Sequence, residues 1–94
     1  MRIIKYTSQF KRDYKREKRG QHKVTLDDKL LTVVRLLTID KPLPELMHDH
    51  PLTGNLKDCR DCHIRPDLVL IYRKNNNDDI LELVRLGSHS ELSI

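Results

Sequence analysis

The stretch CRDCH, Cys59–His63, holds residue types that could carry out several kinds of chemistry. As C-x-x-C-H it matches the attachment signature of a c-type haem, and its thiols could instead form half of a zinc site. It also places the carboxylate of Asp61 close to the imidazole of His63, a pair suited to proton transfer near neutral pH. The element that carries the stretch decides among these readings.

The first half of the chain predicts a short strand and two helices. RIIKY suits the strand, and Thr7 or Ser8 could cap a helix that runs to about Gly20 with a basic face toward water. In the second helix, which ends near Asp40, a capping box is predicted at Thr25, and apolar residues recur at helical spacing. These are Leu26, Leu30, Val33, Val34 and Leu37.

The second half predicts three short strands, CRDCHI, LVLIYRK and DILELVRL, joined by turns at RPD and NNNDD. Asn75–Asn77 suit a hairpin because Asn tolerates positive φ. We therefore expect one α+β domain over residues 1–94. It has a short N-terminal strand and two helices on one face of an antiparallel sheet of about four strands, and its other face is open.

Alternation along a strand separates the residues of CRDCH. Cys59, Asp61 and His63 share one face, while Cys62 and Ile64 point to the other. Two cysteines three apart on a strand do not converge on one metal ion, and no second ligand pair stands at the usual spacing. Zinc stays open through His48 and His50, but we expect no metal and no cofactor.

Composition limits the compartment and the partners. Lys and Arg exceed Asp and Glu, giving a net charge of +4, which favours a polyanionic partner such as nucleic acid. No apolar run is long enough for a signal peptide or a membrane span. We therefore expect a cytoplasmic protein with reduced cysteines and no membrane partner.

Four motifs between Asp49 and Leu92 resemble the YafQ branch of the RelE/ParE toxin superfamily. They are D-H-P-L-x-G, R-D-x-H, P-D-x-x-L-I-Y and G-S-H, and they stand in the family's order. The resemblance implies a RelE-like fold and a type II toxin that cleaves messenger RNA on the ribosome without a metal. It also implies a cognate, DinJ-like antitoxin as partner in a hetero-oligomer.

The resemblance also assigns residues. It implies a catalytic set of His50, Asp61, His63, Asp67 and His89. Arg85 is expected to hold phosphate, and Arg60 and Arg73 are assigned to phosphate or RNA binding. His22 and His48 receive no role and are expected to be exposed.

The implied set suits metal-free RNA cleavage. That reaction needs a base for the 2′-OH, an acid for the leaving 5′-oxygen and stabilisation of the phosphorane. The sequence does not separate base from acid among these rings, and we take His50 as base and His89 as acid. At two positions where many relatives carry aromatics, Leu68 and Ser93 stand here, so base stacking is expected to differ.

Two other classes of function remain open from sequence. One is a non-catalytic toxin or binding module of the same fold, like the ParE-type gyrase inhibitors, which would need no histidine cluster. The other is a small metal-binding domain that uses Cys59, Cys62 and His63.

Overall fold

A five-stranded mixed sheet forms the centre of the computed structural model, which describes residues 1–20 and 23–94; His22 lies outside them. The strand order is β1-β5-β4-β3-β2. The strands are β1 Ile3–Tyr6, β2 His50–Pro51, β3 Arg60–Arg65, β4 Leu68–Asn75 and β5 Ile80–Gly87.

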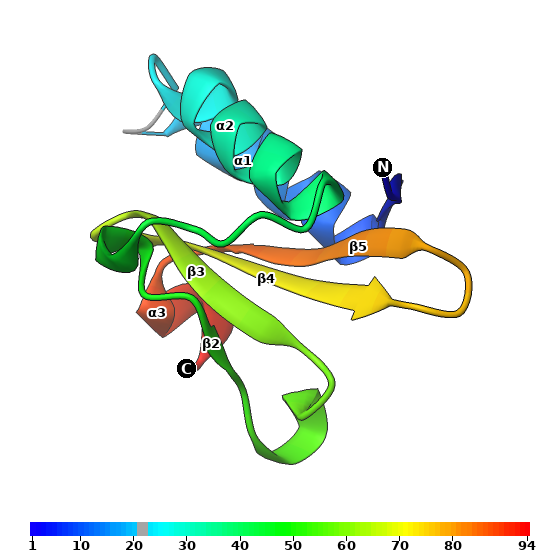
Figure 1. Ribbon diagram of the computed structural model, residues 1–94. Coiled ribbons are helices and arrows are strands. Elements are labelled where there is room, and N and C mark those ends of the chain that lie inside the picture. The colour runs from blue at the N-terminus through cyan, green and yellow to red at the C-terminus, as the bar shows by residue number, and fades with distance from the viewer. Residues whose placement is uncertain (21–22) are drawn as a thin grey trace.

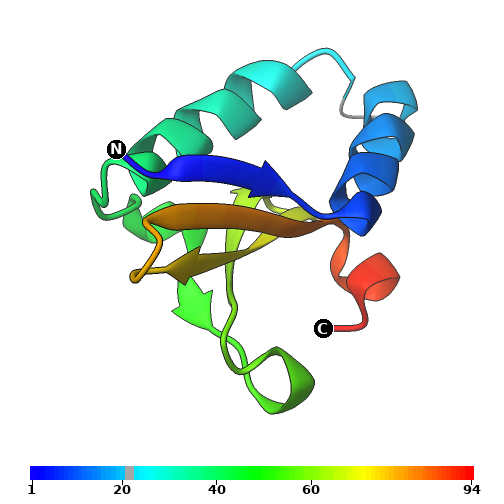
Figure 2. The ribbon, with the colours of Figure 1, turned by 90° about the vertical axis from the view of Figure 1, so that its right-hand side faces the viewer.

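Helices α1, Ser8–Arg19, and α2, Leu26–Thr38, lie on one side of this sheet (Figure 1). The third helix, α3, His89–Leu92, lies on the opposite side, as Figure 2 shows from a second direction. Two short 3-10 helices, η1 Glu45–Met47 and η2 Gly54–Leu56, flank β2. No helix in the described ranges has the length and apolarity to cross a bilayer.

The start of α1 follows the predicted capping, whereas the start of α2 does not. Thr7 Oγ1 accepts a hydrogen bond of 2.9 Å from the Phe10 N–H and so caps α1. Thr25 stands at the N-cap of α2, but its side chain makes no capping bond. Its hydroxyl instead accepts a hydrogen bond of 3.0 Å from Arg65 Nη1, and this bond links the start of α2 to β3. The predicted capping box was therefore wrong.

The main core fills the space between the sheet and the two long helices. Phe10 of α1 and the predicted stripe of α2 pack on alternate residues of the central strands, which include Cys62, Ile64, Leu70 and Tyr72. The apolar periodicity of α2 and the alternation of β3 therefore predicted this layer correctly.

The opposite face is only partly open, contrary to expectation. Leu92 of α3 packs there with Cys59, Val69 and Ile71 in a second small cluster, flanked by Leu52 and Leu56. Four residues of α3 and the η2 turn thus cover part of the face that we expected to be exposed.

The sheet also differs from the predicted antiparallel sheet of four strands. β1 pairs with β5 in parallel, because the two helices return the chain to the far edge of the sheet before the meander begins. A fifth strand, β2, consists only of His50 and Pro51, too short to show any period.

The hairpin between β4 and β5 forms at the predicted Asn-rich turn for a different reason. Asn75 Oδ1 accepts hydrogen bonds from the N–H groups of Asn77 and Asp78, at 3.0 and 3.2 Å. The positive φ, 56°, falls on Asp79 and not on an asparagine.

Candidate active site

Strand register brings three distant segments of the chain to one end of the sheet. His50 of β2 pairs with Asp61 of β3, and His63 of β3 pairs with Val69 of β4. Val69 in turn pairs with Gly87, the last residue of β5, so His89 follows directly at the same end. The result is a cluster of imidazoles on the side of β3 that faces away from α1 and α2.

Asp61 lies at the centre of this histidine cluster, which consists of His48, His50, His63 and His89. Its side chain is buried, and among the described residues its Oδ1 accepts no aligned hydrogen bond. Burial raises the pKa of Asp61, and the nearby positive charges of His50, His63 and His89 only partly oppose this rise. The buried carboxylate is therefore only partly compensated by its neighbours.

His50 is held between a carbonyl and this carboxylate. Its Nδ1 lies 2.6 Å from the backbone oxygen of His48, and since a carbonyl only accepts, Nδ1 carries a proton. Its Nε2 lies 3.0 Å from Asp61 Oδ1. A proton on Nε2 would therefore make His50 an imidazolium paired with Asp61.

His63 lies between two other imidazoles. Its ring centre is 4.9 Å from that of His89, edge to face, and 5.1 Å from that of His48. Burial, followed by the charge of His89, lowers the pKa of His63, while Asp61 opposes the shift. His63 is therefore mostly neutral at pH 7 and has a basic nitrogen.

His48, which received no role from the sequence, belongs to this cluster. It ends η1 in the left-handed region, with φ 49°, and is exposed as expected. Its N–H donates to Glu45 O at 3.0 Å. The only sign of this in the sequence was that His48 lies two residues before His50. The pairing of β2 with β3 is what brings His48 close to His63.

The remaining assigned positions lie in the turn after β3, in the main core and at the end of α3. Asp67 lies exposed in the turn that joins β3 to β4. Leu68 is fully buried in the main core, so this side chain offers no stacking surface to a base. Ser93 is exposed directly after α3.

Arg85 forms an ion pair with a buried aspartate of α1. Its Nε and Nη2 donate to the two oxygens of Asp13 at 2.7 and 3.2 Å. Burial alone would raise the pKa of Asp13, but hydrogen bonds from Arg85 and from the Leu86 N–H bring it below the ordinary value. Nothing in the sequence indicated that Asp13 would point inward to β5, because most charged residues of this helix are basic.

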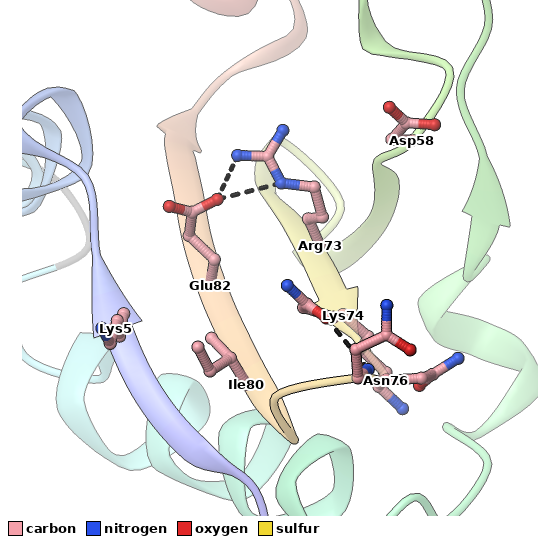
Figure 3. A pocket seen from close by; sticks show the side chains of 9 residues that line it. Lys5, Asp58, Arg73, Lys74, Asn76, Ile80 and Glu82 are labelled. Atoms are coloured by element: carbon pink, nitrogen blue, oxygen red, sulfur yellow. Dashed lines mark hydrogen bonds and ion pairs between the residues drawn. The ribbon is translucent and has the colours of Figure 1, made fainter.

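Arg60 and Arg73 are also paired. Arg60 Nε donates to Asp49 Oδ1 at 3.1 Å, and the hydroxyl of Tyr72 donates to the same oxygen at 2.5 Å. Arg73 contacts Glu82 through Nε at 2.9 Å and through Nη2, in the polar hollow that Figure 3 shows. Neither arginine contacts an imidazole in any interaction found among the described residues.

The two cysteines are free, buried and on opposite faces of the sheet. Cys62 packs in the main core, and Cys59 packs with Leu92. Within residues 1–20 and 23–94, no group of three or more His, Cys, Asp or Glu side chains is arranged to hold a metal ion. The thiols of Cys59 and Cys62 therefore do not converge on one ion.

Comparisons with known proteins agree with this architecture. Residues 2–94 match the family described as bacterial toxin of type II toxin–antitoxin system, YafQ. The mRNA interferase toxin YafQ of Escherichia coli K12 is 35% identical, covering 97% of this chain and 95% of that protein.

Two solved structures show the same fold. The metal-bound toxin from Helicobacter pylori is 41% identical, with a TM-score of 0.82 over 98% of this chain and 99% of that one. YafQ in the E. coli DinJ–YafQ complex is 34% identical, with a TM-score of 0.79 over 98% of both chains.

This small mixed sheet, with two helices on one face, has the RelE-like fold of a toxin. This chain belongs to the YafQ family of type II toxins.

Proposed function

We propose that this protein cleaves messenger RNA on the ribosome, without a metal, and that a cognate antitoxin inhibits it. The observation that carries the proposal is the histidine cluster gathered around the buried carboxylate of Asp61. The name of the E. coli relative, an mRNA interferase, supports the reaction class. The non-catalytic alternative gives no reason for such a cluster.

The chemistry needs two proton transfers. A base takes the proton of a 2′-OH, whose oxygen attacks the adjacent phosphorus. The bond from phosphorus to the 5′-oxygen then breaks, an acid protonates that oxygen, and a 2′,3′-cyclic phosphate remains. Each transfer by a positioned group typically contributes about 10²–10⁴-fold.

His63 suits the base better than His50 does. The lowered pKa of His63 leaves a neutral ring at pH 7, whereas both nitrogens of His50 already face acceptors. We therefore propose His63, and not His50, as the base. His50 then serves as the charged partner of Asp61, and His89, on the other side of His63, remains the proposed acid.

The arginines and Asp67 are proposed as auxiliary groups, because the arginines already pair with carboxylates. Arg85 would have to leave Asp13, or share its Nη groups, to reach a phosphate. Arg60 would similarly compete with Asp49. Asp67, in the turn after β3, would act from the rim of the cluster.

The antitoxin is proposed from the family and from charge. The E. coli YafQ chain was solved in complex with DinJ, and this chain has a net charge of +4. A segment that is acidic and folds on binding would suit such a surface.

Primer extension on a message in a translating extract tests the proposal. We expect cleavage by the parent, and a loss of at least about 100-fold in both His63→Ala and His89→Ala. Lys29→Ala, on the exposed side of α2, is the matched control and should cut like the parent.

Chelation separates the metal question from the rest. Cleavage by protein treated with EDTA, in a reaction whose ribosomes keep their magnesium, is expected to match that of untreated protein. Loss restored by a transition metal would overturn metal independence. Parent-like cutting by His63→Ala would overturn the role of the cluster.

A further inference from the structure

We propose that Arg16 of α1 is a positioning residue that holds His89 in the histidine cluster through Glu91. This inference rests on the proposed function, since it concerns how one proposed catalytic ring is kept in place. It is carried by the contacts between α1, the end of β5 and α3.

The helix that carries His89 is too short to be stable by itself. α3 spans only His89–Leu92, whereas isolated helices below roughly 12–15 residues are marginal in water. Its position must therefore come from its cap and from tertiary contacts. Ser88 and Glu91 form a capping box, with Glu91 Oε1 accepting from the Ser88 N–H at 2.8 Å and Ser88 Oγ accepting from the Glu91 N–H at 3.1 Å.

Arg16 supplies a link from the capping box to the rest of the fold. Its Nε donates to Glu17 Oε2 at 3.0 Å and also lies 3.1 Å from Glu91 Oε2, the carboxylate oxygen that the cap leaves available, as an ion pair. Its Nη2 donates to Leu86 O at 2.8 Å, and its Nη1 donates to Asp13 Oδ1 at 3.0 Å. One planar guanidinium, whose donors are held in a fixed fork, thus connects α1, β5 and α3.

The space around Gly87 shows how closely this guanidinium approaches the strand. A Cβ at Gly87 would lie 2.8 Å from Arg16 Nη2 and 3.2 Å from Glu91 Oε1. Gly87 is therefore the residue that lets Arg16 pass under the start of α3 and reach Glu91. A side chain at Gly87 would require the Arg16 guanidinium to move from its contacts with Leu86 O and Asp13.

Charge favours the same arrangement. Burial disfavours the charged form of Arg16, but a hydrogen bond to Glu17 and the charges of Glu91 and Asp13 more than offset this and raise its pKa. Removing Arg16 does not leave Asp13 alone, because Asp13 keeps Arg85 and the Leu86 N–H. We therefore expect the fold to survive a change at Arg16.

The test compares Arg16→Gln with Arg35→Gln, an exposed arginine of α2 that serves as the matched control. We expect Arg16→Gln to lower kcat for message cleavage about 10-fold with little change in KM, because the proposed acid is displaced while ribosome docking is not. NMR signals of the His89 ring should shift in Arg16→Gln and not in Arg35→Gln. Arg16→Lys should restore part of kcat.

A double-mutant cycle with Glu91→Gln tests the route. Gln keeps the capping-box acceptor but loses the charge that pairs with Arg16. If Arg16 acts through Glu91, the double variant should be no worse than the worse single variant. Multiplying losses would overturn the route through Glu91.

Two outcomes decide separately on the function and on the inference. A parent protein that does not cleave message overturns the proposed function, while the His89 ring signals still report on positioning. Unchanged His89 signals and parent-like kcat in Arg16→Gln overturn the inference, even where cleavage by the parent stands.

Discussion

At the scale of single residues, backbone geometry decides where protons sit. The left-handed turn at His48 presents its carbonyl to His50 Nδ1, and that contact leaves Nε2 of His50 facing Asp61. No pattern in the sequence predicts this, because it depends on one φ angle and a two-residue strand. The alternation of Asp61 and His63 against Cys62, by contrast, was predictable and is present.

Replacing His48 separates its backbone role from its ring. Gly adopts the left-handed region without strain, so His48→Gly should keep His50 in place and cleave message within about tenfold of the parent rate. His48→Val should cleave more slowly, because a β-branched residue is strained there by roughly 1–3 kcal/mol and the carbonyl would move. Cleavage rates and the ¹⁵N signals of His50 measure this; faster cutting by the Val variant would contradict it.

Asp61 should limit stability while it serves the site. Because burial raises its pKa, the folded chain binds this proton more tightly than the unfolded chain does. Its favourable contribution is therefore present below the ordinary carboxyl pKa and is lost as the pH rises through the raised value. We expect Asp61→Asn to be more stable than the parent at pH 7, by on the order of 1 kcal/mol, and to cleave poorly.

Urea unfolding at two pH values tests the sign. The advantage of Asp61→Asn should shrink toward about pH 3.5, where the parent carboxyl is protonated in both states. Asp58→Asn, an exposed change of the same kind, should show no such advantage. An Asp61→Asn variant that unfolds more easily than the parent at pH 7 would show that the carboxylate is stabilising.

At the scale of elements, the main helices and the three long strands followed from periodicity. The apolar stripe of α2 and the alternation in β3 reflect one buried side each, and burial is what these periods report. The parallel pairing of β1, the two residues of β2 and the placement of α3 did not follow. They depend on tertiary partners far away in the sequence: β5 for β1, β3 for β2, and the cluster around Val69 and Ile71 for α3.

A substitution at Gly87 tests how α3 is held, because the end of β5 and the start of α3 meet there. Gly87→Ala should displace α3, since its Cβ would lie 2.8 Å from a guanidinium held by several partners. We expect a loss of about 1–3 kcal/mol in stability and at least about tenfold in cleavage. Gly20→Ala is the control, because a Cβ there meets nothing closer than 3.6 Å.

Chemical denaturation and the extract assay report the two effects of Gly87→Ala. Equal stability and equal cleavage in the Gly87 and Gly20 variants would show that α3 tolerates the added methyl group. It would also show that the Arg16 guanidinium can move away from Gly87.

At the scale of the whole molecule, helix α1 and the histidine cluster lie on opposite sides of the sheet. Helix α1, with its exposed basic residues, lies on one side of the sheet (Figure 1), whereas His63 alternates with the core residues Cys62 and Ile64 and so points to the other side. We propose that the basic face of α1 docks to ribosomal RNA, so that changes in α1 and changes in the histidine cluster alter docking and cleavage separately. The net charge of +4 follows from composition, but the position of the basic helix α1 across the sheet from the histidine cluster does not.

Salt should weaken docking in proportion to the phosphates that α1 contacts. We expect Arg12→Gln with Arg19→Gln to reduce ribosome affinity and to lower the slope of log K against log salt by about 1–2. Cleavage by ribosomes at saturation should stay near the parent rate. Binding measured between about 50 and 200 mM salt checks this, and an unchanged slope would place the RNA contact elsewhere.

The pairing of β1 with β5 has a consequence for a chain that is still being made. β1 emerges first, yet its partner strand comes near the end, and His89 follows that strand. A nascent chain that stops before β5 lacks both the neighbour of its first strand and the last imidazole. Translation that is interrupted on the toxin's own message therefore yields fragments without a complete cluster.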